Sequence, residues 1–231
     1  MTDLHTHILP GMDDGAPDVQ TALAMLKAEA EQGIKTVALT PHFYRGRERA
    51  SDFLARRARA MDKLREAMTG TDYPRLILSA EVAYVPGIAD MEELDRFCYE
   101  GTKTVLIEPP MTEWNAEMFR QLYAIEGRRG LTPMIAHLDR YLGTQKRANI
   151  EQLLDAGFPL QISNAAVVHF IGRNRALELL TDYNAILVSD CHNTTTRPPD
   201  FDRASKVLQK KLDVDAGAFC RMPECFYGED E

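Results

Sequence analysis

The sequence predicts an α/β fold built on parallel strands. Short apolar or β-branched runs alternate with amphipathic stretches along most of the chain, and no long linker separates them. Because a chain that alternates strands and helices returns to the sheet by crossover connections, these strands are expected to be parallel. Polar side chains follow the expected strands at the same end, which indicates a shared site there.

Seven strands are expected from their apolar and β-branched content. They cover residues 3–8, 36–39, 76–79, 104–107, 133–136, 159–162 and 185–189.

Helical spacing and terminal glycines predict the intervening helices. The first helix follows Pro17 and is expected to stop at Gly33, and the second covers residues 54–68. A less regular helix after the fourth strand is expected to end before Gly127, and another leads into Gly157.

Two architectures fit this alternation, a closed barrel and an open doubly wound sheet. In a barrel every strand can contribute to one site at its carboxyl-terminal rim, whereas an open sheet places its site at one switch point. Periodicity does not separate the two, but polar residues at every expected strand end favour the barrel.

Composition narrows the class of protein. The 231 residues are enough for one sizeable core, and the net charge of −8 argues against a nucleic-acid-binding surface. No apolar run is long enough for membrane insertion, and residues 1–4 show no secretory signal, so a cytoplasmic location with reduced cysteines is expected. Cys220 and Cys225 form a lone C-x4-C pair, a weak indication of a metal or redox site. No feature indicates an oligomeric state.

Histidines and carboxylates stand at the expected strand ends, and five of the six histidines are among them. The set comprises His5, His7, Asp13, Asp14, His42, Glu81, Glu108, His137, Asp139, Asp190 and His192, with Ser163 and Asn164 after the sixth strand. Taken singly, each has an ordinary alternative, such as a hydrogen-bonded histidine or Asp14 as a helix cap. Together, converging carboxylates without counter-charge are costly, and divalent cations remove that cost. Imidazole with carboxylate suits Mn, Fe or Zn better than an all-oxygen calcium site.

Phosphate chemistry is suggested by Arg140 and Arg197, which follow the fifth and seventh strands and could bind phosphoryl oxygens bidentately. A competing motif is C-x5-R, formed by Cys191 and Arg197, the spacing of cysteine-dependent tyrosine phosphatases. Its loop lacks the glycine that phosphate-cradling loops need, so a cysteine nucleophile is disfavoured. His169 lies outside any strand end and is interpreted as structural.

Residues 3–15 (DLHTHILPGMDDG) resemble the opening motif of the bacterial PHP (polymerase and histidinol phosphatase) type protein tyrosine phosphatases, the capsule-regulator family that includes CpsB and YwqE. The resemblance continues through residues 40–42, 80–82, 107–108, 135–141, 161–164 and 189–193, to about Arg197. Asp139, Phe43 and Cys191 depart from residues that are commoner in that family.

The resemblance implies a distorted (β/α)7 barrel (the PHP fold) with three divalent metals, usually manganese or iron. His5, His7, Glu81 and Asp190 would hold the first metal; Glu81, Glu108 and His137 the second; Asp14, His42 and His192 the third. Arg140 and Arg197 match the family's phosphate-binding arginines. The implied substrate is phosphotyrosine on a bacterial tyrosine kinase that controls capsule or exopolysaccharide synthesis.

Residues 1–231 are therefore expected to form a single phosphatase domain, with an atypical tail after about residue 213 that ends in the acidic run 228–231. Two alternatives stay open: a small-molecule phosphatase of the histidinol-phosphate type, and a non-catalytic, metal-stabilised regulatory module.

Overall fold

The protein is described from a computed structural model, which covers residues 1–223 and residue 226. All strand pairings within its two sheets are parallel, as the alternation of strands and helices predicts. One sheet has the order β1-β2-β4 and the other β3-β5-β6-β7-β8-β9. The strand bounds are β1 (Thr2–Thr6), β2 (Thr36–Leu39), β3 (His42–Phe43), β4 (Arg75–Leu78), β5 (Glu81–Ala83), β6 (Thr104–Glu108), β7 (Thr132–Ile135), β8 (Leu160–Ser163) and β9 (Ala185–Val188).

These strands form seven staves, because β2 continues after two residues as β3 and β4 continues after two residues as β5. The gap between β9 and β1 is bridged near the carboxyl end, where Thr6 pairs with Cys191 in parallel. There the His7 N–H donates to the Cys191 carbonyl at 2.9 Å and the Asp190 N–H donates to the His5 carbonyl at 2.9 Å. The staves thus close into a distorted barrel, and the predicted α/β class is confirmed.

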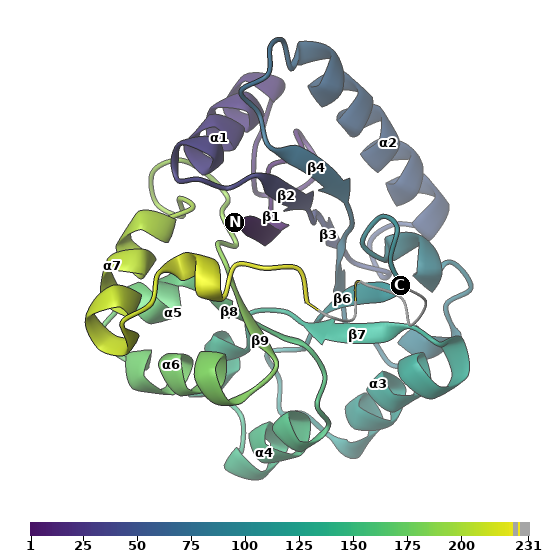
Figure 1. The fold of residues 1–231 in the computed structure, drawn as a ribbon. Coiled ribbons are helices and arrows are strands. Elements are labelled where there is room, and N and C mark those ends of the chain that lie inside the picture. Colours follow the sequence, from purple (N-terminus) through teal and green to yellow (C-terminus); the bar gives the residue numbers. More distant parts are fainter. Residues whose placement is uncertain (224–225, 227–231) are drawn as a thin grey trace.

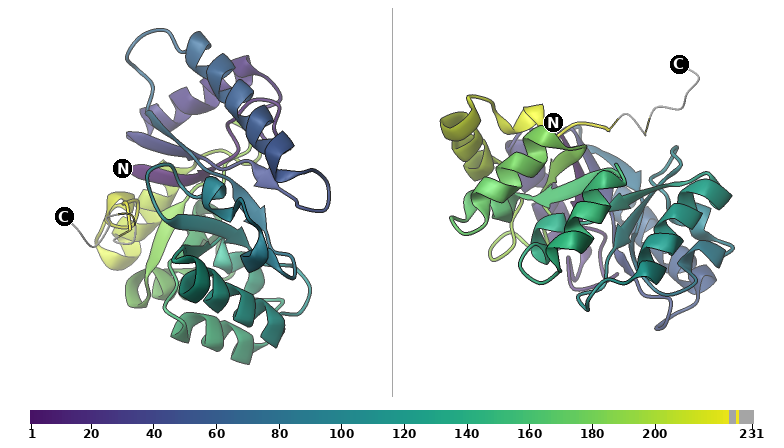
Figure 2. Two further views of the ribbon diagram at one scale, coloured as in Figure 1. Left: turned by 90° about the vertical axis from the view of Figure 1, so that its right-hand side faces the viewer. Right: turned by 90° about the horizontal axis from the view of Figure 1, so that it is seen from below.

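Helices surround the staves (Figures 1 and 2). Their bounds are α1 (Val19–Glu31), α2 (Ala50–Ala67), α3 (Ala116–Arg129), α4 (Arg147–Asp155), α5 (Asn164–Val168), α6 (Arg173–Asp182) and α7 (Phe201–Leu212), with 3-10 turns η1 (Ile88–Asp90), η2 (Leu94–Phe97), η3 (Leu138–Tyr141) and η4 (Ala216–Ala218). The helix α3 passes through Gly127, so the predicted end there is wrong. It ends instead at Gly130, whose φ of 62° gives the left-handed cap that glycine favours.

Two apolar layers stabilise the barrel. The outer layer lies between the strands and the helices, and the inner layer fills the amino-terminal half of the barrel. We call this inner layer the floor; it contains Leu4, Ala38, Ile77, Tyr99, Leu106, Met134, Ala136, Ile186, Val188 and Phe226. The Tyr99 hydroxyl donates to the Leu4 carbonyl at 2.9 Å, so the polar atom of this buried ring is satisfied.

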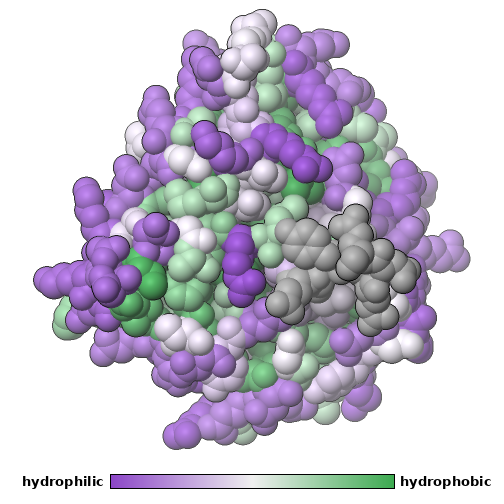
Figure 3. Space-filling view, viewed as in Figure 1, coloured by the Kyte–Doolittle hydropathy of each residue, from purple (hydrophilic) through white to green (hydrophobic). Residues whose placement is uncertain are grey.

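The segment after residue 213 crosses the amino-terminal end of the barrel (Figure 1). The Thr2 N–H donates to the Cys220 carbonyl at 3.0 Å, and the Leu187 N–H donates to the Phe219 carbonyl at 3.1 Å. The tail therefore fills the space between β1 and β9 at this end. On the same face, hydrophilic residues dominate the outer edge, and hydrophobic residues are more frequent towards the middle (Figure 3).

Two sequence features fall outside the described residues, namely Cys225 and the acidic run 228–231. Within the described part of the chain, no helix combines the length and the apolar character needed to cross a membrane.

The strand β1 contains a bulge that directs one side chain to the floor and the next one to the opposite end of the barrel. Asp3 pairs with Val37 and Thr6 with Leu39, so Leu4 and His5 together face Ala38. Two residues opposite one is the signature of a β-bulge, which re-aims side chains next to many active sites. As a result Leu4 packs into the floor while His5, the next residue, reaches the opposite end of the barrel interior.

Candidate metal centre

The nine residues predicted as metal ligands converge at the carboxyl-terminal end of the staves, which we call the rim. Their side chains come from β1 and the loop after it, from the starts of β3 and β5, from the end of β6, and from the segments after β7 and β9. Each of the nine has a ring nitrogen or carboxylate oxygen within 4 Å of another member. The barrel thus brings together side chains that are up to 187 positions apart in the sequence.

The first group lies around two histidines of the opening motif. His5 Nε2 and His7 Nε2 are 3.2 Å apart, and each faces Glu81 Oε2, at 3.2 Å and 3.4 Å. Asp190 Oδ1 lies 3.3 Å from His7 Nε2 and 3.6 Å from His5 Nε2. These four side chains are buried, so four donor atoms point at one another in a space shielded from water.

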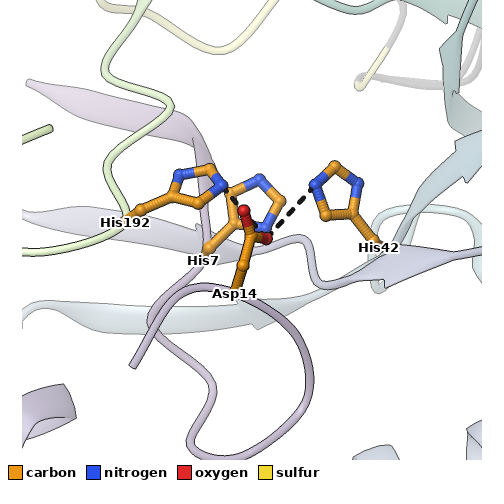
Figure 4. A group of neighbouring side chains, drawn as sticks. All are labelled: His7, Asp14, His42 and His192. Carbon is orange, nitrogen blue, oxygen red and sulfur yellow. Dashed lines mark ion pairs between the residues drawn. The ribbon is translucent and has the colours of Figure 1, made fainter. Parts of the chain in front are cut away.

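The second group is centred on Asp14 (Figure 4). Asp14 Oδ1 lies 3.5 Å from His192 Nε2 and 3.7 Å from His42 Nε2, and His7 completes the group. The Asp14 side chain is 67% exposed, whereas the helix cap of α1 is Asp18, which accepts from the Thr21 N–H. The capping alternative for Asp14 is therefore wrong.

The third group shares Glu81 with the first. Glu81 Oε1 lies 2.7 Å from His137 Nε2, and Glu81 Oε2 lies 2.9 Å from His42 Nδ1. Glu108 reaches both histidines at 3.9 Å. His42 is therefore about as close to Glu81 and Glu108 as His137 is. Because His42 also faces Asp14, it lies between the second group and the third.

Unsatisfied buried atoms test whether this cluster suits a metal. Within the described residues, His42 Nδ1, Glu81 Oε2, His137 Nδ1, Asp190 Oδ1 and His192 Nε2 are buried and have no hydrogen-bond partner. Buried polar atoms are normally paired, and carboxylates and imidazoles that converge without partners are costly. Four of these five atoms face other members of the cluster, and the mixed nitrogen and oxygen set suits divalent transition metals. The residues fit a metal centre.

Outer partners orient the rings for coordination. His5 Nδ1 lies 2.7 Å from Gln161 Oε1, and His7 Nδ1 lies 2.7 Å from Asp13 Oδ2. His192 Nδ1 lies 3.0 Å from the Asp190 carbonyl. In each ring this leaves Nε2 for the cluster, the arrangement that metal-binding histidines commonly adopt.

Gly15 lets the Asp13–Asp14 turn press against β1. A Cβ atom at this position would collide with the His7 carbonyl oxygen. Asp13 also accepts from the His42 N–H at 2.9 Å, so one carboxylate ties two ligand-bearing segments together.

The carboxylates of the rim have pKa values that are shifted in opposite directions. Burial opposes ionisation of Glu81, yet His5 and His137 outweigh it and hold the Glu81 pKa well below its usual range. Burial likewise opposes ionisation of Asp190, but His5 and His7 lower its pKa. Burial and the neighbouring Glu81 charge raise the pKa of Glu108. Glu81 and Asp190 are therefore held in the ionised form, the form in which a carboxylate binds a metal.

Backbone strain marks two of the candidate ligands. His137 has a φ of 28° and Asp190 a φ of 53°, a region that non-glycine residues seldom adopt. Such conformations persist where the surrounding structure enforces them, and they are concentrated at functional sites.

The two arginines predicted to bind phosphate meet at one carboxylate. Arg197 Nη2 donates to Asp190 Oδ2 at 2.8 Å, and Arg140 Nη2 donates to the same oxygen. The Arg140 side chain is 36% exposed and the Arg197 side chain is 37% exposed, so both guanidinium groups lie between the rim and the solvent. Their remaining N–H donors can bind oxygens of an anion placed beside Asp190.

The competing cysteine nucleophile does not fit the structure. Cys191 is fully buried, and its thiol donates to Glu29 Oε1 at 3.4 Å, on the side of β1 that faces α1. Burial, and then the charges of Glu29 and Asp3, raise the Cys191 pKa well above its usual value. A thiol that is shielded and protonated cannot attack phosphorus.

Sequence reasoning left several supporting residues without a role. Gln161 and Asp13 orient histidines, and Asp139 accepts from the Ser163 N–H at 2.8 Å. The signal for Gln161 was a polar residue in the middle of an apolar, fully buried strand. His169 follows α5 directly and lies outside the metal-competent groups found among the described residues.

Similarity to known proteins extends over most of the chain. The family model described as "Capsular polysaccharide synthesis, CpsB/CapC" matches residues 1–222. Tyrosine-protein phosphatase YwqE of Bacillus subtilis (strain 168) is 30% identical over 219 residues, which cover 92% of this chain and 85% of YwqE. Tyrosine-protein phosphatase CpsB of Streptococcus agalactiae is 24% identical over 221 residues, which cover 90% of this chain and 89% of CpsB.

Solved structures share the fold. A structure from the work on YwqE of Bacillus subtilis and CpsB of Streptococcus pneumoniae, described as metal-dependent tyrosine phosphatases, aligns with a TM-score of 0.73 at 24% identity, covering 96% of this chain and 94% of the other. The lactonase Lmo2620 of Listeria monocytogenes aligns with a TM-score of 0.57 at 14% identity, covering 97% and 92%. One barrel architecture therefore occurs with different named activities, so the function is argued from the rim.

Proposed function

The chain belongs to the CpsB/CapC family of capsular polysaccharide synthesis, and from this premise we propose that it is a metal-dependent phosphatase of protein phosphotyrosine. The observation that carries the proposal is the cluster of buried, unpartnered nitrogen and oxygen atoms beside two arginines that share Asp190. The substrate is a bacterial tyrosine kinase that controls capsule or exopolysaccharide synthesis, and the reaction takes place in the cytoplasm. The family description names capsular polysaccharide synthesis and the relatives are named tyrosine-protein phosphatases, which supports the capsule and phosphotyrosine parts of this assignment.

Three divalent metals, manganese in the first place with iron or zinc as alternatives, would occupy the rim. His5, His7, Glu81 and Asp190 would hold the first; Glu81, Glu108 and His137 the second; Asp14, His42 and His192 the third. The unpaired Oε2 of Glu81 and Oδ1 of Asp190 support their assignment as ligands, since the other oxygen of each carboxylate already has a partner.

Bound metals would supply an activated water at neutral pH and charge for the phosphoryl oxygens. The protein's own contribution is to place and stabilise the phosphoryl group. Arg140 and Arg197 approach from one side, where their free N–H donors can bind the non-bridging oxygens as charge builds up. Asp190 holds both guanidinium groups in place before the substrate arrives, so little reorganisation is needed.

The departing group would be a tyrosine phenolate, whose conjugate acid has a pKa of about 10. This is a better leaving group than an alkoxide, so the site works without a dedicated acid for the phenol oxygen. A phosphatase with this rim is therefore expected to prefer aryl phosphates to alkyl phosphates.

Phosphate release from a phosphotyrosyl peptide, before and after chelation, tests the proposal. Activity should disappear with the chelator and return when manganese is added. The Cys191→Ser variant should behave like the wild type, because the thiol faces Glu29. Activity that ignores the chelator and disappears in Cys191→Ser would overturn the metal mechanism. Turnover of small alkyl phosphates in preference to the peptide would favour the small-molecule alternative.

A further inference from the structure

The five rim histidines differ in what holds their rings in place. In His5, His7 and His192, Nδ1 lies 2.7 Å, 2.7 Å and 3.0 Å from an oxygen of an outer partner. Among the described residues, the rings of His42 and His137 have no hydrogen bond to a group outside the cluster, and the Nδ1 atom of each has no hydrogen-bond partner at all. The orientation of these two rings therefore needs another physical cause.

Each of the two rings is stacked on a tyrosine. The ring centroids of His42 and Tyr44 are 5.3 Å apart, at an interplanar angle of 29°. Those of His137 and Tyr141 are 5.9 Å apart, at 28°. Offset stacking at such separations is favoured by aromatic rings. In the described part of the chain, the three hydrogen-bonded histidines have only other histidines as ring neighbours, so the two kinds of support do not overlap.

A local turn holds Tyr44 in its place. The Arg47 N–H donates to the Tyr44 carbonyl at 2.8 Å, which closes a turn directly after β3. This turn brings the Arg47 guanidinium over the tyrosine ring, with Cζ 4.4 Å from the ring centroid. A cation over an aromatic face is attracted by the electrons of the ring. Arg47 therefore supports Tyr44, and Tyr44 supports His42.

Tyr141 is held more firmly than Tyr44. Its side chain is fully buried, and its hydroxyl donates to the Pro109 carbonyl at 2.7 Å, just after β6. Tyr44 is only half-buried. Tyr44 is thus the tyrosine that can be replaced with the smaller effect on the fold.

The plane of a histidine ring decides where its nitrogens point. The ring rotates over a broad range about the Cβ–Cγ bond, and the lone pair that binds a metal lies in the ring plane. A stacked neighbour restricts this rotation by covering one face. It does not raise the basicity of the ring, however, as an outer hydrogen-bond acceptor does. A stacked histidine is therefore oriented like a hydrogen-bonded one but is a weaker ligand.

We propose that Tyr44 is a positioning residue that sets the ring plane of His42 for metal binding. Tyr141 does the same for His137. The inference rests on the proposed function, because it takes the assigned metals at the rim. The first metal would be held by two histidines with outer hydrogen bonds, whereas the second and the third each depend on one stacked histidine. Manganese should therefore bind tightly at the first position and more weakly at the other two.

The test is competition for manganese between the full-length protein and a chelator. Tyr44→Leu keeps an apolar side chain but removes the ring, so affinity at the weak positions should fall about three- to tenfold, as expected from losing an aromatic pair. Tyr44→Phe keeps the ring and should stay within about twofold of the wild type. Arg47→Ala, at an exposed side chain, should lower the weak affinity about twofold or more.

Two further measurements separate positioning from a general structural role. When manganese saturates the rim, kcat for p-nitrophenyl phosphate in Tyr44→Leu should return to the wild-type value, because affinity rather than chemistry is impaired. Tyr123→Leu is the matched control, since it makes the same exchange on α3, where the ring is 44% exposed and packs beside Phe158. This control should keep the wild-type affinity at every position.

The wild type and the variants distinguish the possible failures. Unchanged weak affinity in Tyr44→Leu or in Arg47→Ala would overturn the inference. An equal loss in Tyr44→Leu and Tyr44→Phe would do so too, since the hydroxyl rather than the ring would then matter. In both cases the wild type still binds manganese, and the proposed function stands. If the wild type itself binds no manganese, the proposed function fails, and this inference fails with it.

Discussion

The rim and the floor of the barrel are built from the same staves, yet the floor buries apolar side chains and the rim buries polar ones. On β9, Ile186 and Val188 pack into the floor, and Asp190, two residues after the end of the strand, reaches the rim. The floor is apolar, and its buried Tyr99 hydroxyl is paired. The rim holds buried carboxylates and imidazoles, unpartnered atoms and two strained ligand backbones.

This contrast separates the residues that stabilise the fold from the residues that form the functional site. Apolar burial in the floor and the outer layer is the driving force for folding. The rim lacks that support and violates the usual rule that buried polar groups are paired, which is expected at functional sites. Substitutions in the two regions should therefore damage different properties, and the following experiments test this separation.

The largest effect is expected at the shared carboxylate of the rim. Glu81→Gln keeps the shape of the side chain but removes the charge that four histidines face. Turnover should fall about 1,000-fold or more, because loss of an outer partner alone costs about 10–100-fold. Circular dichroism should still show a folded protein. Turnover above one tenth of the wild-type rate would remove Glu81 from the metal centre.

The reverse is expected for the floor. Ile186→Ala should lower the free energy of unfolding by about 2–5 kcal/mol, the usual cost of truncating a buried aliphatic side chain. Because Ile186 is buried in the apolar floor, kcat at 25 °C should stay within about twofold of the wild type, against the 10²-fold or larger effects of rim groups. Urea unfolding and steady-state kinetics on the same preparation give both numbers. A large loss of kcat with unchanged stability would contradict the division.

Arg140→Ala separates phosphoryl binding from metal binding. Removing one donor that stabilises transition-state charge costs about 10²–10³-fold in kcat, and this range is expected here. Metal content, measured by elemental analysis, should stay at the wild-type value. Arg120→Ala, at an exposed arginine on α3, is the matched control and should leave both unchanged. Loss of metal together with activity would show that Arg140 acts through Asp190.

A smaller effect is expected one step outside the ligands. Asp13→Asn keeps an oxygen for the His42 N–H but weakens the charged partner of His7. Burial opposes protonation of His7, but bonds to Asp13, Asp190 and Glu81 outweigh it and raise the His7 pKa well above normal. Metal affinity should fall about 10–100-fold, with activity restored by excess manganese. Unchanged affinity in a competition titration with a chelator would remove Asp13 from this role.

The strands, and the histidines and carboxylates that follow them, were predictable from the sequence because both depend on local pattern. Each expected strand lies within two residues of an observed one, and the apolar runs explain this agreement. Gly127 misled the prediction of α3, since burial of Met118, Leu122 and Ile125 outweighs the propensity of one glycine.

The remaining features depend on contacts between distant parts of the chain. Gln161 meets His5 across 156 positions, and Thr2 pairs with the Cys220 carbonyl of the tail. The bulge at Leu4 and His5 depends on the register with Ala38, which no single strand encodes. Asp13 and Asp14 are adjacent and chemically alike, so only the fold assigns one to His7 and the other to His42 and His192.

The central claim is that the rim performs phosphotyrosine hydrolysis through bound metal. The most direct test is to remove all metal, titrate manganese back, and measure bound manganese per chain together with phosphate release from a phosphotyrosyl peptide. We predict no turnover at zero metal, and turnover that rises with occupancy and saturates at up to three ions per chain. Full turnover in protein shown to be metal-free would contradict the account.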